Sequence, residues 1–255
     1  MRDFSLQGKV YLGERLANGK PGAMRWVNDA GLLNIAMSVT EENRQESYSG
    51  NRQTSATLNT ATEVTFNLTL RHGDAKNLAL GLYGKALTVA SGSKTGEPLP
   101  EPLTIGDRVI LDRGNISNLV LSDSAGTPTE LVEDTDYRIE SVPGGVLEIL
   151  SDLSGFTAPF EADYEFGAST DVTMFTERPP IRYLMLDGVN TVDDSGDRIR
   201  ARLYRLKFNP VNQLDLINES FGELALSGTA LFDPLSEPDP ALGGFGRIEL
   251  LDEGA

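Results

Sequence analysis

Two stretches of strict apolar–polar alternation, separated by about twenty polar residues, constrain the fold of this chain most. In residues 33–40 and again in 62–71, every second residue is apolar. A period of two predicts half-buried antiparallel strands, because successive side chains point to opposite faces of a sheet. The apolar set is Ile35, Met37, Val39, Val64, Phe66, Leu68 and Leu70, and the polar set is Asn34, Ser38, Thr40, Thr65, Asn67 and Thr69, with Glu41, Glu42 and Glu63 at the ends.

Residues 41–61 connect these two strands and are dominated by Glu, Asn, Arg, Gln, Ser and Thr. The segment is too long for a hairpin turn, and loops above about 12 to 15 residues usually have a function or are disordered. We expect a long polar loop that becomes ordered against a neighbouring subunit; a loop that is simply flexible is the alternative. The candidate contact residues of this inter-subunit loop are Glu41, Glu42, Arg44, Glu46, Tyr48 and Arg52.

The length of 255 residues fits one elaborated all-β domain spanning residues 1–255. Within it we expect an N-terminal arm over residues 1–30, a possible elaboration over 91–160 and a C-terminal extension over 233–255. Asp74 is a candidate N-cap for one short helix that ends at Gly84. Residues 212–221 fit either a helical turn or a loop. Further short strands are expected at 86–90, 109–111, 119–121, 137–139, 146–150, 164–166, 181–186, 199–208, 224–232 and 247–251.

The formal net charge of −16 disfavours tight DNA binding, which depends on Lys and Arg neutralising phosphates. Acidic residues gather between residues 123 and 171, whereas four arginines cluster near residue 200. Such opposite patches can attract one another across an interface between copies. The alternative is that the acidity only maintains solubility. The basic interface candidates are Arg198, Arg200, Arg202 and Arg205, and their change of face between Arg202 and Arg205 predicts a β-bulge.

The residue inventory offers little for catalysis. No Cys and one His exclude thiolate chemistry, Cys-based zinc sites and sites with several His ligands. Walker and Rossmann glycine loops are absent, and the run from Asp193 to Asp197 lacks the later Glu of a calcium loop, so a hairpin turn is expected there. Asp163 and Glu165 have the spacing of a glycosidase pair, but any solvated acidic strand shows it too. We expect no enzyme activity, cofactor or metal, although a carboxylate-only hydrolase needs neither His nor Cys.

Three stretches carry a resemblance to the major tail tube proteins of long-tailed, non-contractile bacteriophages. Residues 62–70 run into "NLALGLYG" of the expected helix, residues 181–190 read "IRYLMLDGVN", and "LYRLKFNP" at 203–210 is followed by residues 224–234 with their "DP" end. The resemblance covers about 70 positions of pattern and order, and it is weakest over residues 91–160. None of the three stretches is a catalytic signature.

The resemblance implies an antiparallel β-sandwich flanked by one helix, in six subunits per ring. The lumen-facing sheets would complete a β-barrel, and the rings would stack into a conduit for phage DNA in the virion tail, assembled in the host cytoplasm. The implied partners are other copies of the chain and the tape measure, tail terminator and distal tail proteins. Six copies of −16 would place 96 negative charges on a ring, so that DNA passes without specific binding. Lumen candidates are Asn34, Ser38, Thr40, Glu63, Thr65, Asn67 and Thr69.

A carbohydrate- or receptor-binding β-sandwich of a virion or cell surface is the competing hypothesis. Such modules usually present exposed aromatic platforms, and this chain has one Trp and 7% aromatic residues. Residues 1–30 lack the apolar core of a signal peptide, and no apolar run reaches the roughly 20 residues needed to cross a bilayer. We therefore predict no membrane span. Deleting residues 43–58 should leave a folded monomer that no longer polymerises.

Overall fold

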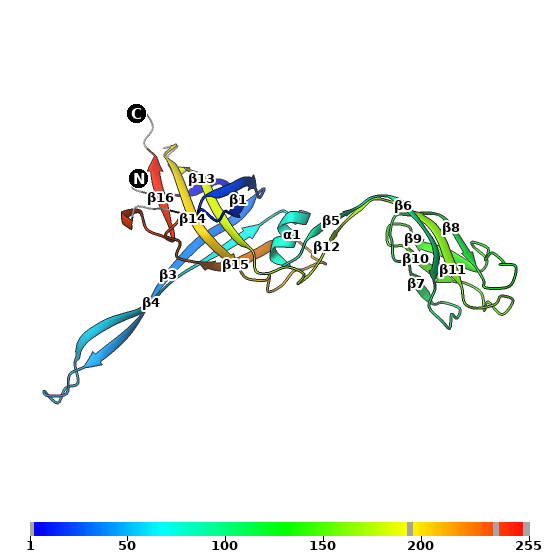
Figure 1. Cartoon of the computed structure of the whole chain (residues 1–255), viewed down its shortest axis with the longest axis horizontal. Coiled ribbons are helices and arrows are strands. Elements are labelled where there is room, and N and C mark those ends of the chain that lie inside the picture. Colours follow the sequence, from blue (N-terminus) through cyan, green and yellow to red (C-terminus); the bar gives the residue numbers. More distant parts are fainter. Residues whose placement is uncertain (1–2, 193–195, 237–239, 252–255) are drawn as a thin grey trace. The chain divides into compact units, whose positions relative to one another are not determined.

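The computed structural model describes residues 3–192, 196–236 and 240–251, and it divides the chain into two compact units (Figure 1). Unit 1 comprises residues 1–86 and 172–255, and unit 2 comprises residues 87–171, drawn in green. The prediction of a single domain is therefore wrong, because the inserted residues build a hydrophobic core of their own. The predicted elaboration at residues 91–160 lies entirely within unit 2. Both units are mainly β with antiparallel sheets, as the alternation predicts.

Unit 1 is built on one antiparallel sheet with the strand order β2-β1-β13-β14-β15-β4-β3, and β16 also pairs with β14. The predicted N-terminal arm is instead the first hairpin of this sheet, because Val10 and Leu12 of β1 are buried in the core. The predicted C-terminal extension likewise returns to the sheet through β16. The bounds are β1 (Leu6–Arg15), β2 (Pro21–Trp26), β3 (Ala30–Gln45), β4 (Thr54–Leu70), β13 (Ile181–Asn190), β14 (Arg198–Phe208), β15 (Leu224–Ala230) and β16 (Gly246–Leu251), with a short 3-10 helix η2 at Pro240–Leu242.

The helix α1 (Ala75–Gly81) covers the core of unit 1 where the sequence predicts a helix. Asp74 is its N-cap, and the Asp74 Oδ1 accepts a hydrogen bond from the Asn77 backbone N–H at 2.8 Å. Leu80 packs among apolar side chains of β1, β4, β13, β14 and β15. Gly81 allows a close approach, since a Cβ there would lie 2.9 Å from the Leu226 side chain.

A β-bulge interrupts β14, as the change of face of the arginines predicts. Arg182 of β13 pairs with Leu206, whereas Leu184 pairs with Leu203, so β14 carries one extra residue. Leu203 and Leu206 are three positions apart and would lie on opposite faces of a regular strand, but the extra residue keeps both in the core.

The strands β3 and β4 form one long hairpin that includes most of the predicted loop. β3 has 16 residues and β4 has 17, and their pairing continues outward to Gln45 and Thr54. Only residues 46–53 form the turn, so the prediction of a long loop over residues 41–61 is wrong. The physical reason is that both faces of this ribbon meet solvent in the single copy, which removes the apolar alternation that marks a strand.

Unit 2 consists of two three-stranded sheets around one core. The sheets have the orders β7-β10-β9 and β6-β11-β8, and both contribute buried side chains such as Leu147 and Leu121. The pair β5 (Ala86–Val89) and β12 (Ser169–Val172) carries the chain out of unit 1 and back. The other bounds are β6 (Gly92–Pro98), β7 (Arg108–Ile110), β8 (Ile116–Ser122), β9 (Tyr137–Ser141), β10 (Val146–Ile149) and β11 (Glu161–Phe166).

Candidate assembly surface

The outer part of the β3–β4 hairpin, residues 36–63, is exposed along its whole length except at Glu46, and we call it the arm. Even its large apolar side chains face water: Met37 is 78% exposed and Leu58 is 62% exposed. The arm extends away from the rest of the sheet, towards the lower left of Figure 1. An isolated two-stranded ribbon is only marginally stable in water. The arm therefore leaves large apolar side chains uncovered in the single copy.

The tip of the arm is organised around Glu46. Its carboxylate accepts hydrogen bonds from the backbone N–H groups of Tyr48 and Ser49 at 2.9 and 2.8 Å and from the Ser49 hydroxyl. These bonds, that from the Ser49 hydroxyl foremost, lower the pKa of Glu46 to about 2. Tyr48 beside it is 90% exposed. The predicted contact residues thus fall on strand positions (Glu41, Glu42 and Arg44) and on the turn (Glu46, Tyr48 and Arg52).

The predicted lumen residues share one face of the sheet. Asn34 lies opposite Asn67, and the Asn67 Nδ2 donates a hydrogen bond to the Asn34 Oδ1 at 3.0 Å. Ser38 lies opposite Glu63, and Thr65 and Thr69 occupy the same face of β4. The opposite face of β4 carries the buried Val64, Phe66, Leu68 and Leu70. Thr229 and Ser227 of β15 extend the polar face, since they pair with Thr65 and Asn67.

The strand order of unit 1 ends at β2 on one side and at β3 on the other. β16, off this path, pairs with β14 along one side and presents a further edge among the described residues. Unpaired edges are usually protected, because their free N–H and C=O groups recruit further strands.

Charge is distributed unevenly between the units. Unit 2 contains sixteen of the acidic residues and four of the basic residues, a net charge of −12, which leaves −4 for unit 1. Three quarters of the net negative charge therefore belongs to the inserted unit and not to the sheet with the predicted lumen face.

Two of the basic interface candidates have a partner inside their own chain. Glu249 of β16 binds both Arg200 and Arg202, the latter at 2.5 Å, and also Arg247 at 2.8 Å. These hydrogen bonds, that from Arg200 foremost, lower the pKa of Glu249. Arg200 and Arg202 thus tie β16 to β14 within the chain, and their role at an interface between copies stays a prediction. For Arg198 and Arg205, no ion pair is found within the described part of the chain.

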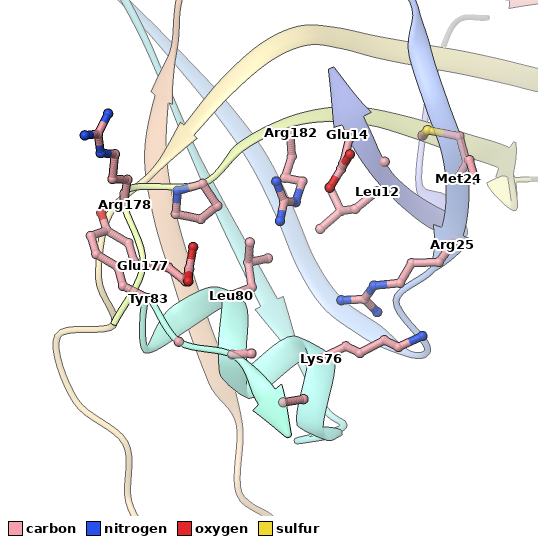
Figure 2. Close-up of a pocket in the computed structure, with 16 residues that line it drawn as sticks. Leu12, Glu14, Met24, Arg25, Lys76, Leu80, Tyr83, Glu177, Arg178 and Arg182 are labelled. Carbon is pink, nitrogen blue, oxygen red and sulfur yellow. The ribbon is translucent and has the colours of Figure 1, made fainter. Parts of the chain in front are cut away.

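A cavity of about 730 Å³ opens in unit 1 between β1, β2, α1 and the segment that leads into β13. Figure 2 shows the side chains of Arg25 and Arg182 extending toward a common space above Leu80. Arg25 donates a hydrogen bond from Nη2 to the Asn77 Oδ1 at 2.6 Å, and Asn77 is fully buried. Burial lowers the pKa of Arg25, the Asp74 carboxylate works in the opposite direction, and Arg182 adds to the lowering.

Four cations and two carboxylates line this cavity, which gives it a positive balance in an acidic chain. One of the carboxylates, Glu177, is bound by Lys85 at 2.7 Å. The sequence gives no local signal for the site, because Arg25 and Arg182 lie on strands from opposite ends of the chain. We call this cavity the basic pocket.

The acidic motifs singled out in the sequence do not form a cluster. Asp163 accepts a hydrogen bond from the Gly96 N–H at 2.7 Å, and Glu165 accepts one from the Asn118 Nδ2 at 2.9 Å. Each carboxylate thus has a local structural partner. Residues 193–195 of the run from Asp193 to Asp197 lie outside the described residues. Across residues 3–192, 196–236 and 240–251, no group of three or more acidic or His side chains is placed to hold a metal.

In the same described ranges, no helix is long and apolar enough to cross a membrane. A search of curated proteins found no match to the chain. The model of the family described as "Protein of unknown function UCP028589" matches residues 3–249, which include almost all of both units. The chain therefore belongs to the family described as "Protein of unknown function UCP028589".

Proposed function

We propose that this protein is the structural subunit of a bacteriophage tail tube, in which hexameric rings stack into a conduit for DNA. The observation that carries the proposal is the arm. At about 3.3 Å per residue, the 16 residues of β3 span roughly 50 Å. Over much of that length, neither face of the β3–β4 ribbon is covered in the single copy. A ribbon of this kind gains stability when neighbouring copies cover it.

Ring closure would use the two end strands of the sheet in unit 1. β2 of one copy would lie beside β3 of the next, so that six sheets join into one closed barrel. Cyclic pairing would satisfy the free N–H and C=O groups of these two strands. The arm, including Tyr48 at its tip, would then contact a neighbour in the same ring or in the next ring. The sandwich architecture and the hexamer implied by the sequence resemblance belong to this proposal.

The polar face formed by Asn34, Asn67, Thr65 and Thr69 would line the lumen. Short uncharged polar side chains offer DNA phosphates no cation to bind. Six copies of unit 1 would contribute about −24 to a ring, compared with −72 from six copies of unit 2. Weak repulsion combined with the uncharged side chains of this part of the face would let DNA pass without being held, with Lys207 of β14, the register partner of Thr229, as an exposed cation beside it. The tape measure, tail terminator and distal tail proteins would be the further partners, and the virion tail the location.

A receptor- or carbohydrate-binding role is the second candidate, and the independent core of unit 2 is the observation that favours it. Its aromatic side chains argue against a sugar platform. In residues 87–171, all of which the structure describes, Tyr137, Phe160 and Tyr164 are buried and Phe156 and Phe166 are half-buried. Sugar-binding sites typically expose such rings. The tail tube proposal therefore has the stronger support.

The test is to shorten the arm without touching the core. Replacing residues 43–57 by Asn-Gly leaves Glu42 and Leu58, which are register partners, joined by a two-residue turn. No residue of the core of unit 1 lies in this segment. The variant should keep the circular dichroism spectrum and the melting temperature of unit 1 but form no rings or tubes by negative-stain microscopy. Normal tubes from this variant would refute the role of the arm.

A further inference from the structure

The loop between β14 and β15 exposes large apolar side chains to an unusual degree. Leu216 is 82% exposed, Ile217 is 96% exposed and Phe221 is 100% exposed. The loop is nevertheless anchored at both ends. The Val211 N–H donates to the Gly81 carbonyl at 2.8 Å, and Leu224 is buried in the core. The loop is thus attached to the fold at both ends, and its centre is presented to solvent.

The loop is also acidic. Residues 212–223 contain Asp215, Glu219 and Glu223 and no Lys or Arg. It therefore presents apolar side chains and carboxylates together. A surface that accepts it needs apolar walls and an excess of cations.

The basic pocket has these properties. Leu12, Met24 and Leu80 supply apolar lining, and Arg25 and Arg182 extend into the space above Leu80 (Figure 2). Lys76 and Arg178 add further positive charge at its margin. The pocket and the loop are therefore complementary in both charge and polarity.

The loop starts beside α1, whose residues also line the pocket of the same copy, because the Val211 N–H bonds to the Gly81 carbonyl. It ends at Leu224, the first residue of β15. Leu224 pairs with Leu70 of β4, and Leu70 pairs with Ala30 of the edge strand β3. The end of the loop thus lies two strands from β3, which in the proposed ring faces β2 of the next copy, and β2 borders the pocket of that copy.

We infer that the loop at residues 212–223 of one copy docks into the basic pocket of a neighbouring copy, with Phe221 against the apolar wall and the loop carboxylates facing Arg25 and Arg182. The occupant is thus a second copy of this chain. The inference rests on the proposed self-assembly. It adds a specific side-chain contact between copies to the pairing of their strand edges.

Disulfide trapping tests this contact, because the chain contains no Cys. One full-length copy carries Ala23→Cys, at an exposed position in the pocket lining. A second full-length copy carries Ser220→Cys in the loop and a tag that makes it distinguishable by size. After mixing and mild oxidation, we expect the mixed disulfide at least tenfold above that of a control mixture with Thr127→Cys in unit 2. Adding Arg182→Glu to the first copy should reduce the yield several-fold, whereas Arg71→Glu, outside the pocket, should not.

Microscopy of the same mixtures separates the two proposals. Rings or tubes with no mixed disulfide above the control would overturn the docking inference and leave the tail tube proposal standing. A strong mixed disulfide without rings or tubes would support docking and contradict the tube. Neither product would overturn both. A yield unaffected by Arg182→Glu would also overturn the inferred role of the pocket charge.

Discussion

The ion pair between Arg15 and Asp233 makes the stability of unit 1 depend on acid pH. Asp233, three residues after the end of β15, is 1% exposed, and its two carboxylate oxygens accept hydrogen bonds from the Arg15 Nε and Nη2, both at 2.8 Å. The Ser236 hydroxyl donates a further bond at 2.7 Å. These contacts, with Arg15 foremost, lower the pKa of Asp233 from 3.8 to about 2. The pair joins the end of β1 to the segment that leads to β16.

A lowered pKa in the folded state means that ionised Asp233 favours folding. Its contribution is complete above about pH 4, where the carboxyl group is charged in the unfolded chain too, and it is lost as the pH falls towards 2. At 1.36 kcal/mol per pKa unit, the shift corresponds to about 2 kcal/mol. In a protein of this size, that amounts to a difference of about 4 to 8 °C in melting temperature.

The assay compares Asp233→Asn with the unmodified chain by calorimetry between pH 7 and pH 2. At pH 7 the variant should be less stable by at least about 2 kcal/mol, because Arg15 loses the charge of its partner. The difference between the two proteins should shrink as the pH falls from about 4 towards 2, where Asp233 becomes protonated in the folded chain as well. The other carboxylates titrate in both proteins, so their effect on the free energy of unfolding cancels in this difference. A gap that stays constant down to pH 2 would refute the reasoning.

Three further predictions concern the cores and the polar face. Leu147→Ala should destabilise unit 2 by about 2 to 5 kcal/mol, since Leu147 is fully buried, and should lower one of two calorimetric transitions while leaving that of unit 1 in place. Gly228→Ala should lower the melting temperature of unit 1, because a Cβ there would lie 2.2 Å from the Lys207 carbonyl oxygen and 2.7 Å from the Phe66 ring; an unchanged transition would contradict the close approach. Asn67→Lys should make assembled tubes retain DNA in a salt-dependent manner, whereas Thr127→Lys in unit 2 should not.

The sequence predicted well where a residue pattern reports directly on burial. Alternation in residues 62–71 located the inner half of β4, because Val64, Phe66, Leu68 and Leu70 each meet the core. Asp74 and the leucines after it predicted α1. Arg202 and Arg205 are three positions apart, so in a regular strand they would lie on opposite faces. This spacing predicted the bulge in β14, because one extra residue restores the alternation of core and exposed positions on both sides of it.

The arm was missed because periodicity fails where neither face is buried. Residues 41–45 and 54–61 have no core to face, so their composition resembled a loop. The signal present was β-propensity: Thr54, Thr57, Thr60 and Thr62 recur in the segment, and branched side chains favour extended strands.

The two-unit organisation and the basic pocket depend on long-range contacts. The strands of unit 2 look like those of unit 1 in sequence, and only the separate cluster of buried side chains distinguishes them. Arg25 and Arg182 meet because β1 pairs with β2 on one side and with β13 on the other. The sequence contains no sign that Arg200 and Arg202 bind Glu249, because Glu249 follows more than forty residues later.

Electron microscopy of the purified full-length chain over a range of concentrations will show whether identical copies close into rings. We expect hollow rings with six-fold symmetry, or tubes of stacked rings, with the arm ordered between copies. A particle that remains a monomer at every concentration, with the arm free or folded against its own sheet, would contradict it.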